Sequence, residues 1–298
     1  MPAAAAGTVS GMTAQPTLDT MLKEAAPMPS DAGPATVPST VPTAPAGPAA
    51  PVVLDNVTKR YGRGRGALTA LQGVSLSFAA GSFTAVLGVS GSGKSTLLQC
   101  AAGLERPTSG TVRLCGTELN QLSSRRQAML RRRRVGFVFQ DLNLLPELTV
   151  AENIALPLRL DRRPARRPDI EQAAARVGLD AGQLRRRPAE LSGGQQQRAA
   201  IARALVTRPD VIFADEPTGA LDPHTAVGML RLLRSAPDGT TVVIVTHDPQ
   251  VTRFCDQAVF LHEGRVDRIL PAPEPGLVAQ VLYDLGERAG RERHGEPA

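Results

Sequence analysis

The segment of the chain best suited to bind phosphate lies between an apolar stretch, Phe83–Leu87, and a helical one, Lys94–Leu104. It fits the pattern G-x-x-x-x-G-K-[ST] and consists of Gly88, Val89, Ser90, Gly91, Ser92, Gly93, Lys94 and Ser95. Its glycines allow the backbone to fold around phosphates, so that consecutive N–H groups and the helix N-terminus form an anion cradle. Lys94 would reach the β- and γ-phosphates of a nucleotide, and the Ser95 hydroxyl would bind Mg²⁺. A glycine-rich turn without function is the alternative, which the strand–loop–helix context disfavours.

Two acidic residues follow a second apolar stretch. Val211–Ala214 has the composition of a buried strand, and Asp215 and Glu216 come directly after it. Carboxylates at a strand end are also common as solvated loop residues, so this pair alone would be a weak signal. Together with a phosphate loop, however, Asp215 would hold Mg²⁺ through water and Glu216 would polarise an attacking water. The two segments therefore predict hydrolysis of a phosphate bond.

These groups need a scaffold, and strands and helices alternate along the chain from Val52 onward. The expected strands are Val52–Leu54, Val74–Phe78, Phe83–Leu87, Val135–Phe139, Val211–Ala214 and Val242–Val245, and the expected helices are Lys94–Leu104, Gln195–Val206 and Thr225–Leu233. Such alternation predicts a parallel sheet covered on both faces. Residues 141–190 interrupt it with arginine-rich helical pieces, which we interpret as an inserted helical subdomain.

The composition is that of a globular protein. Hydrophobic residues make up 42% and charged residues 21% of the chain, which excludes wholesale disorder and collagen. No stretch approaches the roughly 18–20 consecutive apolar residues that cross a bilayer, and the N-terminus lacks the pattern of a secretory signal. We therefore expect a cytoplasmic protein. Its net charge is +6, and residues 121–190 alone hold 15 Arg against 8 Asp or Glu.

A third segment, Leu191–Gln195, distinguishes between families. Its sequence, Leu-Ser-Gly-Gly-Gln, has a chance rate below about one in a thousand chains, and it precedes a helix whose positive end suits an anion. With it, the chain from about Val53 to Leu270 resembles the ATP-binding subunit of an ATP-binding-cassette (ABC) transporter. The resemblance implies an α/β fold, a P-loop NTPase cassette with a parallel core sheet, an antiparallel β subdomain and an inserted helical subdomain. It also implies ATP and Mg²⁺ as cofactors.

In that family, the Leu-Ser-Gly-Gly-Gln signature of one subunit closes over the ATP held by the phosphate loop of another. The resemblance therefore implies a head-to-tail dimer, here of two copies of this chain, in which the signature residues are Ser192, Gly193, Gly194 and Gln195. It also implies an integral membrane permease as partner, and hence a peripheral position on the cytoplasmic face of the cell membrane. No nucleic acid partner is expected.

The remaining family positions can be matched one by one. Tyr61 resembles an aromatic residue that stacks on adenine, although a core tyrosine is the alternative. Gln140 resembles the glutamine that binds Mg²⁺ and senses the membrane partner, and His247 the histidine that contacts the γ-phosphate. Asp222 matches the loop that crosses the dimer interface, and Thr96 completes the nucleotide-binding loop. The implied catalytic residues are Glu216, His247, Lys94 and Gln140, and the implied metal ligands are Ser95, Gln140 and Asp215.

Three segments resemble one branch of the family, which serves macrolide export, lipoprotein release and antimicrobial-peptide resistance. They are Gly136–Pro146, Leu148–Asn153 and Ala214–Gly219. That branch usually has Asn after its Thr-Gly pair, whereas this chain has Ala220, a departure that touches no catalytic position. In the family the helical subdomain receives short helices of the permease, and we expect a socket formed by Leu142, Leu144, Leu145, Leu148 and Val150.

A soluble ABC ATPase that acts on nucleic acid or ribosomes is the alternative function, because the basic segment could contact phosphates. Two observations oppose it. Translation-type members carry two cassettes, and chromosome-type members insert a long coiled coil, whereas Ser192 follows Lys94 by only 98 residues. Moreover, no aromatic residue for base stacking lies between Gln140 and Val211. A catalytically inactive regulatory cassette is disfavoured because every expected catalytic residue is present.

The chain is thus expected to have three parts. Residues 1–50, with 9 Pro and 13 Ala, predict a disordered tail. Residues 51–270 form the expected ABC ATPase domain, with the helical subdomain at about 141–195, and residues 271–298 a C-terminal helix and tail. One face of that helix carries Leu277, Val278, Val281, Leu282 and Leu285, so we expect it to pack against another element.

Overall fold

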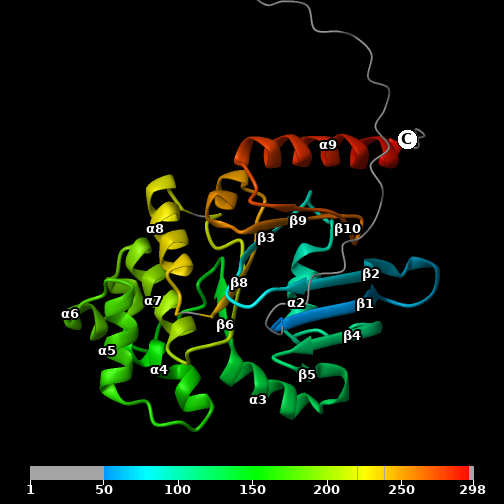
Figure 1. Cartoon of the computed structure of the whole chain (residues 1–298). Helices are drawn as coiled ribbons and strands as arrows, with labels where there is room; N and C mark the ends of the chain where they lie inside the picture. Colours follow the sequence, from blue (N-terminus) through cyan, green and yellow to red (C-terminus); the bar gives the residue numbers. More distant parts are fainter. Residues whose placement is uncertain (1–49, 220, 238, 295–298) are drawn as a thin grey trace, which may run out of the picture. The chain divides into compact units, whose positions relative to one another are not determined.

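The computed structural model describes residues 50–294 except 220 and 238, so the predicted tail at 1–49 lies outside the described residues (Figure 1). A six-stranded sheet forms the centre of this part. Its strand order is β10 (Arg265–Pro271), β9 (Gln257–His262), β3 (Phe83–Leu87), β8 (Thr241–Val245), β7 (Val211–Asp215) and β6 (Val135–Phe139). All neighbouring strands from β9 to β6 are parallel, and β10 pairs with β9 in the antiparallel sense.

The central strands are mostly apolar because both faces of the sheet are covered. In β7, Ile212 and Ala214 point into one buried cluster, while Val211 and Phe213 point into the other. The same alternation occurs in β3, β8 and β9, as the period of two in a strand requires. The sequence therefore lacks the polar alternation of a half-exposed sheet.

A second, antiparallel sheet covers one face. Its order is β2 (Leu68–Phe78), β1 (Val52–Tyr61), β4 (Ser109–Leu114) and β5 (Thr117–Glu118). Helix α2 (Lys94–Ala101) shares a buried cluster with both sheets: Leu97 and Leu98 lie there with Leu54 of β1 and Val243 of β8. The predicted α/β fold with a parallel core and an antiparallel sheet is confirmed.

The other face carries most of the helices, which Figure 1 shows gathered beside β6 and β8. They are α4 (Val150–Leu160), α5 (Arg167–Arg176), α6 (Ala181–Leu184), α7 (Gly193–Leu205) and α8 (Pro223–Arg234), with the 3-10 turns η3 (Pro188–Glu190) and η4 (Pro249–Phe254). A capping box starts α4, since the Thr149 hydroxyl accepts from the Glu152 N–H and the Glu152 carboxylate accepts from the Thr149 N–H. Helix α3 (Ser124–Arg134) leads into β6, and α9 (Pro275–His294) follows β10.

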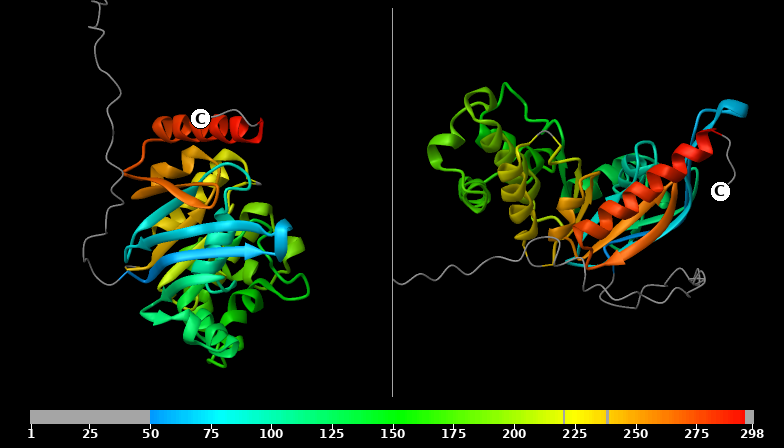
Figure 2. Two further views of the ribbon diagram at one scale, coloured as in Figure 1. Left: turned by 90° about the vertical axis from the view of Figure 1, so that its right-hand side faces the viewer. Right: turned by 90° about the horizontal axis from the view of Figure 1, so that it is seen from above.

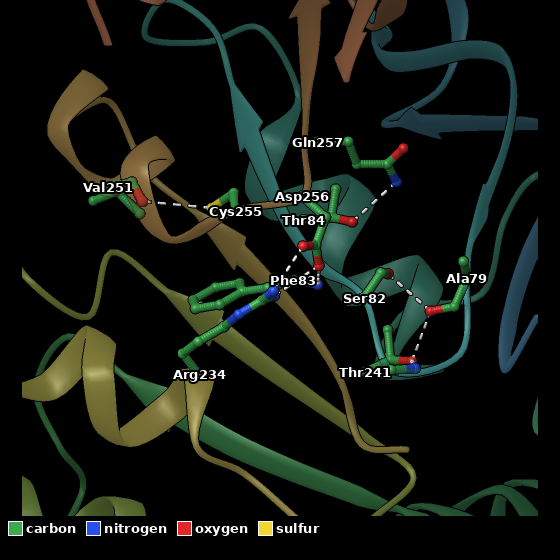
Figure 3. Close-up of polar contacts among 11 residues, drawn as sticks. Ala79, Ser82, Phe83, Thr84, Arg234, Thr241, Val251, Cys255, Asp256 and Gln257 are labelled. Carbon is green, nitrogen blue, oxygen red and sulfur yellow. Dashed lines mark hydrogen bonds and ion pairs between the residues drawn. The ribbon is translucent and has the colours of Figure 1, made fainter. Parts of the chain in front are cut away.

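A polar network joins the beginnings of two central strands (Figure 3). One carboxylate oxygen of Asp256 accepts from the Phe83 N–H and from Arg234, both at 2.7 Å, and the other accepts from Arg234 at 2.8 Å. Gln257 donates to the Thr84 hydroxyl at 3.0 Å in the same region. Asp256 therefore ties β3 to the end of α8, and the hydrogen bond from Arg234 lowers the pKa of its carboxyl.

The boundaries of several predicted elements differ from those observed. Strands β3 and β6 match their predicted ranges, whereas α2 ends at Ala101 rather than Leu104. Its end is set by Gly103 at φ +67°, whose N–H donates to Cys100 while the Leu104 N–H donates to Gln99. These two hydrogen bonds form a Schellman motif, which stops the helix. Strands β4, β5, β9 and β10 and helix α3 were not predicted.

None of the helices within residues 50–294, leaving aside positions 220 and 238, combines the length and the apolar character that crossing a membrane requires.

Candidate active site

The predicted site residues follow four adjacent strands of the central sheet. Strands β3, β8, β7 and β6 are neighbours in this order, and their register aligns Val86, Val245, Asp215 and Phe139 across the sheet. The carboxyl ends of these strands lead into Gly88, His247, Glu216 and Gln140, respectively. Ligands of parallel α/β sheets bind at this edge, so the fold brings the predicted phosphate loop, acids, histidine and glutamine to one place.

The loop after β3 is closed so tightly that two of its residues must be glycine. A Cβ atom on Gly88 would lie 2.3 Å from the carbonyl oxygen of Leu261, and one on Gly93 would lie 2.3 Å from that of Ala70. Both glycines also have positive φ, +154° and +100°. Helix α2 begins directly after Gly93, so its first N–H groups point into the loop, as an anion site requires.

Lys94 lines the cavity at the centre of this edge. The cavity has a volume of about 330 Å³, and its lining residues are Gly88, Val89, Ser90, Lys94, Glu216, His247 and Leu282. The Lys94 ammonium donates to the carbonyl oxygens of Gly88 at 2.9 Å and Val89 at 3.0 Å. Burial lowers the pKa of Lys94, and the charges of Glu216 and Asp215 oppose this shift. An ammonium held here is placed to meet a phosphate entering the loop.

Asp215 ends β7 with a carboxylate that is only partly satisfied. The Ser95 side chain is hydrogen-bonded to it, while its Oδ1 is buried and has no hydrogen-bond partner within the described part of the chain. Burial raises the pKa of the Asp215 carboxyl, the charge of Glu216 adds to that effect, and Ser95 and Lys94 oppose it. A hydroxyl and a carboxylate so close together are the hard oxygen ligands that suit Mg²⁺.

Glu216 has a backbone conformation that is rare for a residue with a side chain. Its φ is +43°, and its N–H donates to the carbonyl of Val245 on the neighbouring strand at 2.9 Å. Carboxylate oxygen Oε1 lies 3.0 Å from Nδ1 of His247. The other oxygen, Oε2, is buried and unpaired among the residues that the structure describes. Glu216 thus lines the cavity with one carboxylate oxygen unpaired, while His247 contacts the other.

Gln140 lies close to the segment that follows Asp215 and Glu216. A Cβ atom built on Gly219 of that segment would lie 3.7 Å from Nε2 of Gln140. The chain then passes through two residues with positive φ, Leu142 at +57° and Asn143 at +48°. Arg203 of α7 holds this conformation by donating to the carbonyl oxygens of both residues. Arg203 was not among the predicted site residues, because nothing distinguishes it from the other Arg residues of the chain's helices.

The signature segment lies at the start of α7. The Ser192 hydroxyl accepts from the Gln195 N–H at 3.4 Å, and the Gln195 side chain accepts from the Ser192 N–H at 3.0 Å, which forms a capping box. A Cβ atom on Gly193 would meet no other atom within 4 Å. None of Ser192 to Gln195 lines the cavity around Lys94. A single chain therefore does not bring its own signature to its own phosphate loop.

The other predicted residues occupy the edges of the site. Tyr61 is the last residue of β1 and is 36% exposed. It pairs with Leu68 of β2, and Ala70 of the same strand lies against Gly93 of the phosphate loop. The Asp222 carboxylate accepts from the N–H groups of His224 and Thr225, both at 3.1 Å, and so caps α8. Thr96 lies in the first turn of α2.

The predicted socket for a permease is partly wrong. Val150 is fully buried, so it cannot contact a partner, and Leu144 is half-buried against the core, while Leu145 is 42% exposed. A groove of about 420 Å³, larger than the cavity at Lys94, lies between α3, β6, α4 and α7. It is lined by Ala128, Arg131, Arg132, Val135, Gly136, Phe137, Phe139, Asn143, Leu156, Pro157, Leu160, Arg203, Ala204 and Thr207.

A phosphate cradle between β3 and α2, with an acidic pair at the end of β7, the next strand but one in the sheet, defines a P-loop nucleoside triphosphatase. The sequence model of the ABC transporter family matches residues 71–219. The chain is 45% identical over 226 residues to the lipoprotein-releasing system ATP-binding protein LolD 1 of Rhodospirillum rubrum, covering 74% of this chain and 98% of that protein. It is 42% identical over 224 residues to the macrolide export ATP-binding/permease protein MacB of Salmonella typhimurium, covering 74% of this chain and 34% of that protein.

A solved structure agrees with these relatives. A dimer of the cassette MJ0796 from Methanocaldococcus jannaschii, in a post-hydrolysis state with ADP and Pi, superposes with a TM-score of 0.68 at 41% identity, covering 74% of this chain and 99% of that one. The chain therefore belongs to the ABC transporter family, as an ATP-binding subunit of the LolD and MacB type that binds and hydrolyses ATP. The alternative of an ATPase acting on nucleic acid is not supported.

Proposed function

We propose that two copies of this chain hold two ATP molecules between them and that hydrolysis drives a separate membrane permease. Each ATP would contact the phosphate loop of one copy and Ser192, Gly193, Gly194 and Gln195 of the other. The observation that carries this proposal is that the signature segment of a chain lies apart from the phosphate loop of the same chain. The cavity at Lys94 is lined by the Lys94 ammonium and by Glu216, the proposed base, but by no signature residue. The dimeric form of the relative MJ0796 supports the same arrangement.

The residues of the cavity would divide the chemistry among them. The loop N–H groups from Gly88 to Thr96 would bind phosphate oxygens, and Lys94 would exchange its bonds to Gly88 and Val89 for the β- and γ-phosphates. The free Oε2 of Glu216 would orient the attacking water and accept its proton. His247 would hold Glu216 in place and contact the γ-phosphate. Tyr61 would stack on adenine, and Asp222 would lie at the copy–copy interface.

The residues beside the loop fit a magnesium ion. Ser95, Asp215 and Gln140 offer a hydroxyl, a carboxylate and an amide oxygen, and Asp215 retains a buried unpaired oxygen within the described residues. When bound, Mg²⁺ would neutralise charge that develops on the transferred phosphoryl group. Ser95 and Asp215 are already joined by a hydrogen bond, so the chain holds two of these ligands together in advance.

We further propose that the permease docks in the groove beside Gln140. Phe137 and Phe139, whose ring centroids lie 5.5 Å apart in a stacked arrangement, line it together with Leu160, which is 54% exposed. Arg203 lines the same groove and holds the loop after Gln140, so a helix seated there could sense movement of that loop. The cassette would comprise residues 51–270, with residues 141–195 as the helical subdomain, and the subunit would lie on the cytoplasmic face of the membrane.

A size measurement tests the two-copy site. In a Glu216→Gln background, which should trap ATP, the chain should change from monomer to dimer when ATP and Mg²⁺ are added, as measured by light scattering after gel filtration. Adding Gly193→Arg should abolish this change, because position 193 is open in one chain but would face the second copy. Gly276→Arg is the matched control, since that exposed glycine in the first turn of α9 is equally open and lies away from the signature segment. A size that is independent of ATP would refute the proposal.

A second experiment tests the groove. Leu160→Glu should release the protein from membranes that contain its permease while the ATPase rate of the free protein is retained. Leu104→Glu places the same charge at a leucine that is 44% exposed and outside the groove, so it should leave membrane binding unchanged. Retention of the Leu160→Glu protein on the membrane would place the docking site elsewhere.

A further inference from the structure

The C-terminal helix α9 packs along one side of the central domain. Figures 1 and 2 show it lying over β9 and β10. Its buried face includes Ala289 and three larger side chains, Val278, Val281 and Leu285, which are at most 3% exposed. Arg288 also donates to Asp267 of β10 at 3.3 Å. Leu277, expected on the same face, is instead 53% exposed. The helix is thus held in place by buried apolar side chains and by the ion pair of Arg288 with Asp267.

The side of α9 next to this buried face reaches the phosphate loop. Leu282 is one turn from Val278 and Leu285, and it lines the same cavity as Lys94, Glu216 and His247. One turn further along, a Cβ atom on Gly286 would lie 3.9 Å from Cγ1 of Val89. Val89 is the residue whose carbonyl oxygen accepts from Lys94. Helix α9 therefore lines the cavity through Leu282 and lies beside Val89 of the phosphate loop at Gly286.

We propose that Leu282 is a positioning residue of the ATP site and that α9 forms the apolar outer wall of the γ-phosphate pocket. The inference rests on the assignment of the phosphate loop made under Proposed function. Among the described residues, all others that line this cavity are polar, charged or part of the phosphate loop, so Leu282 is the one hydrophobic side chain from outside the loop.

An apolar wall at this place has a physical consequence for the chemistry. Charged groups interact more strongly where water is excluded, because the local dielectric constant is lower. Leu282 would keep bulk water from the side of the cavity that Glu216 and His247 do not cover. The contact of Gly286 with Val89 would at the same time keep the carbonyl acceptors of Lys94 in position. Removal of the wall should therefore slow hydrolysis more than it weakens ATP binding.

A pair of charge substitutions tests the placement of Leu282. Leu282→Glu would put a negative charge beside the γ-phosphate, and Leu282→Lys would put a positive charge there. We expect the dissociation constant for ATP, measured with a fluorescent ATP analogue, to be about tenfold higher for the Glu variant than for the Lys variant. The difference should be smaller for ADP, which lacks the γ-phosphate. Leu277→Glu and Leu277→Lys form the matched control pair, because Leu277 lies on the same helix but outside the cavity.

Equal ATP affinities for the two Leu282 variants would overturn the proposal. So would a difference in ATP affinity between the two Leu277 variants as large as that between the two Leu282 variants. Leu282→Ala provides a second measurement: kcat should fall several-fold with KM changed less than about twofold, and Leu282→Met should restore the rate. A higher kcat for Leu282→Ala would also contradict the proposal, since α9 would then obstruct the site. Thermal unfolding of each variant controls for loss of the helix. Failure of the unaltered protein to bind ATP would instead refute the proposed nucleotide site itself.

Discussion

Replacing Glu216 by Gln perturbs the proposed base and almost nothing else. The side chains have the same shape, and a Gln amide can keep a hydrogen bond to His247, which lies 3.0 Å from Oε1. The buried oxygen Oε2, unpaired among the described residues, would be replaced by an amide or a carbonyl that cannot accept a proton. The loss of a positioned general base lowers a rate by about 10²- to 10⁴-fold. We therefore expect kcat to fall by at least about 10²-fold.

Binding of ATP should survive this change. Lys94, Ser95 and the loop N–H groups are untouched, and removal of one negative charge from a cavity that receives phosphates should favour binding. The assay is phosphate release at saturating ATP, with KM or direct nucleotide binding measured in parallel. His247→Ala serves as a comparison, since it removes the orienting partner but leaves the base. A kcat within about threefold of the unaltered rate would refute the role of Glu216.

Two further predictions concern stability and reactivity. Because the folded pKa of Asp256 is lowered by Arg234, its contribution is present above the unfolded pKa of about 3.9 and is lost as the pH falls through the folded pKa. Asp256→Asn should thus lower the free energy of unfolding by about 1 kcal/mol at pH 7, a modest value because the ion pair with Arg234 is partly exposed. The difference between the two proteins should shrink below about pH 4. A difference that stays constant with pH in chemical denaturation would contradict this. Burial raises the pKa of the Cys100 thiol to about 11 and that of Cys255 to about 12. At pH 8 both should react with a disulfide reagent at least about 10²-fold more slowly than an exposed thiol, and rapid labelling of either in the folded protein, mapped by mass spectrometry, would contradict this.

The parts of the fold that could be predicted are those in which burial dictates composition. Phe83–Leu87 and Val135–Phe139 match their predicted ranges because both faces of these strands are covered, so that every residue except the buried Thr84 is apolar or glycine. Strand β10 has an exposed, irregular pattern at the sheet edge and gave no comparable signal. The end of α2 could have been placed correctly from Gly103 alone, since a glycine at the end of an apolar helix commonly forms its C-terminal cap.

The candidate site divides in the same way. Lys94 and Glu216 could be predicted because the phosphate loop and the acidic pair each follow an apolar segment, and Gln140 because the segment around it resembles the family pattern. Leu282 and Arg203 could not, because each acts across a long sequence separation and belongs to an ordinary helical pattern. The spacing of Val278, Val281, Leu282 and Leu285 predicted a packed helix, but it carries no information about the element on which that helix packs. Only the tertiary structure brings Leu282 to the cavity of Glu216.

The central claim is that each ATP is held between two copies of this chain, and the structure of the Glu216→Gln protein with ATP and Mg²⁺ tests it most directly. The account predicts two copies related head to tail, with each ATP touching Lys94 of one copy and Ser192 of the other. ATP held by a single copy with its signature segment facing solvent, or a dimer formed through another surface, would contradict it.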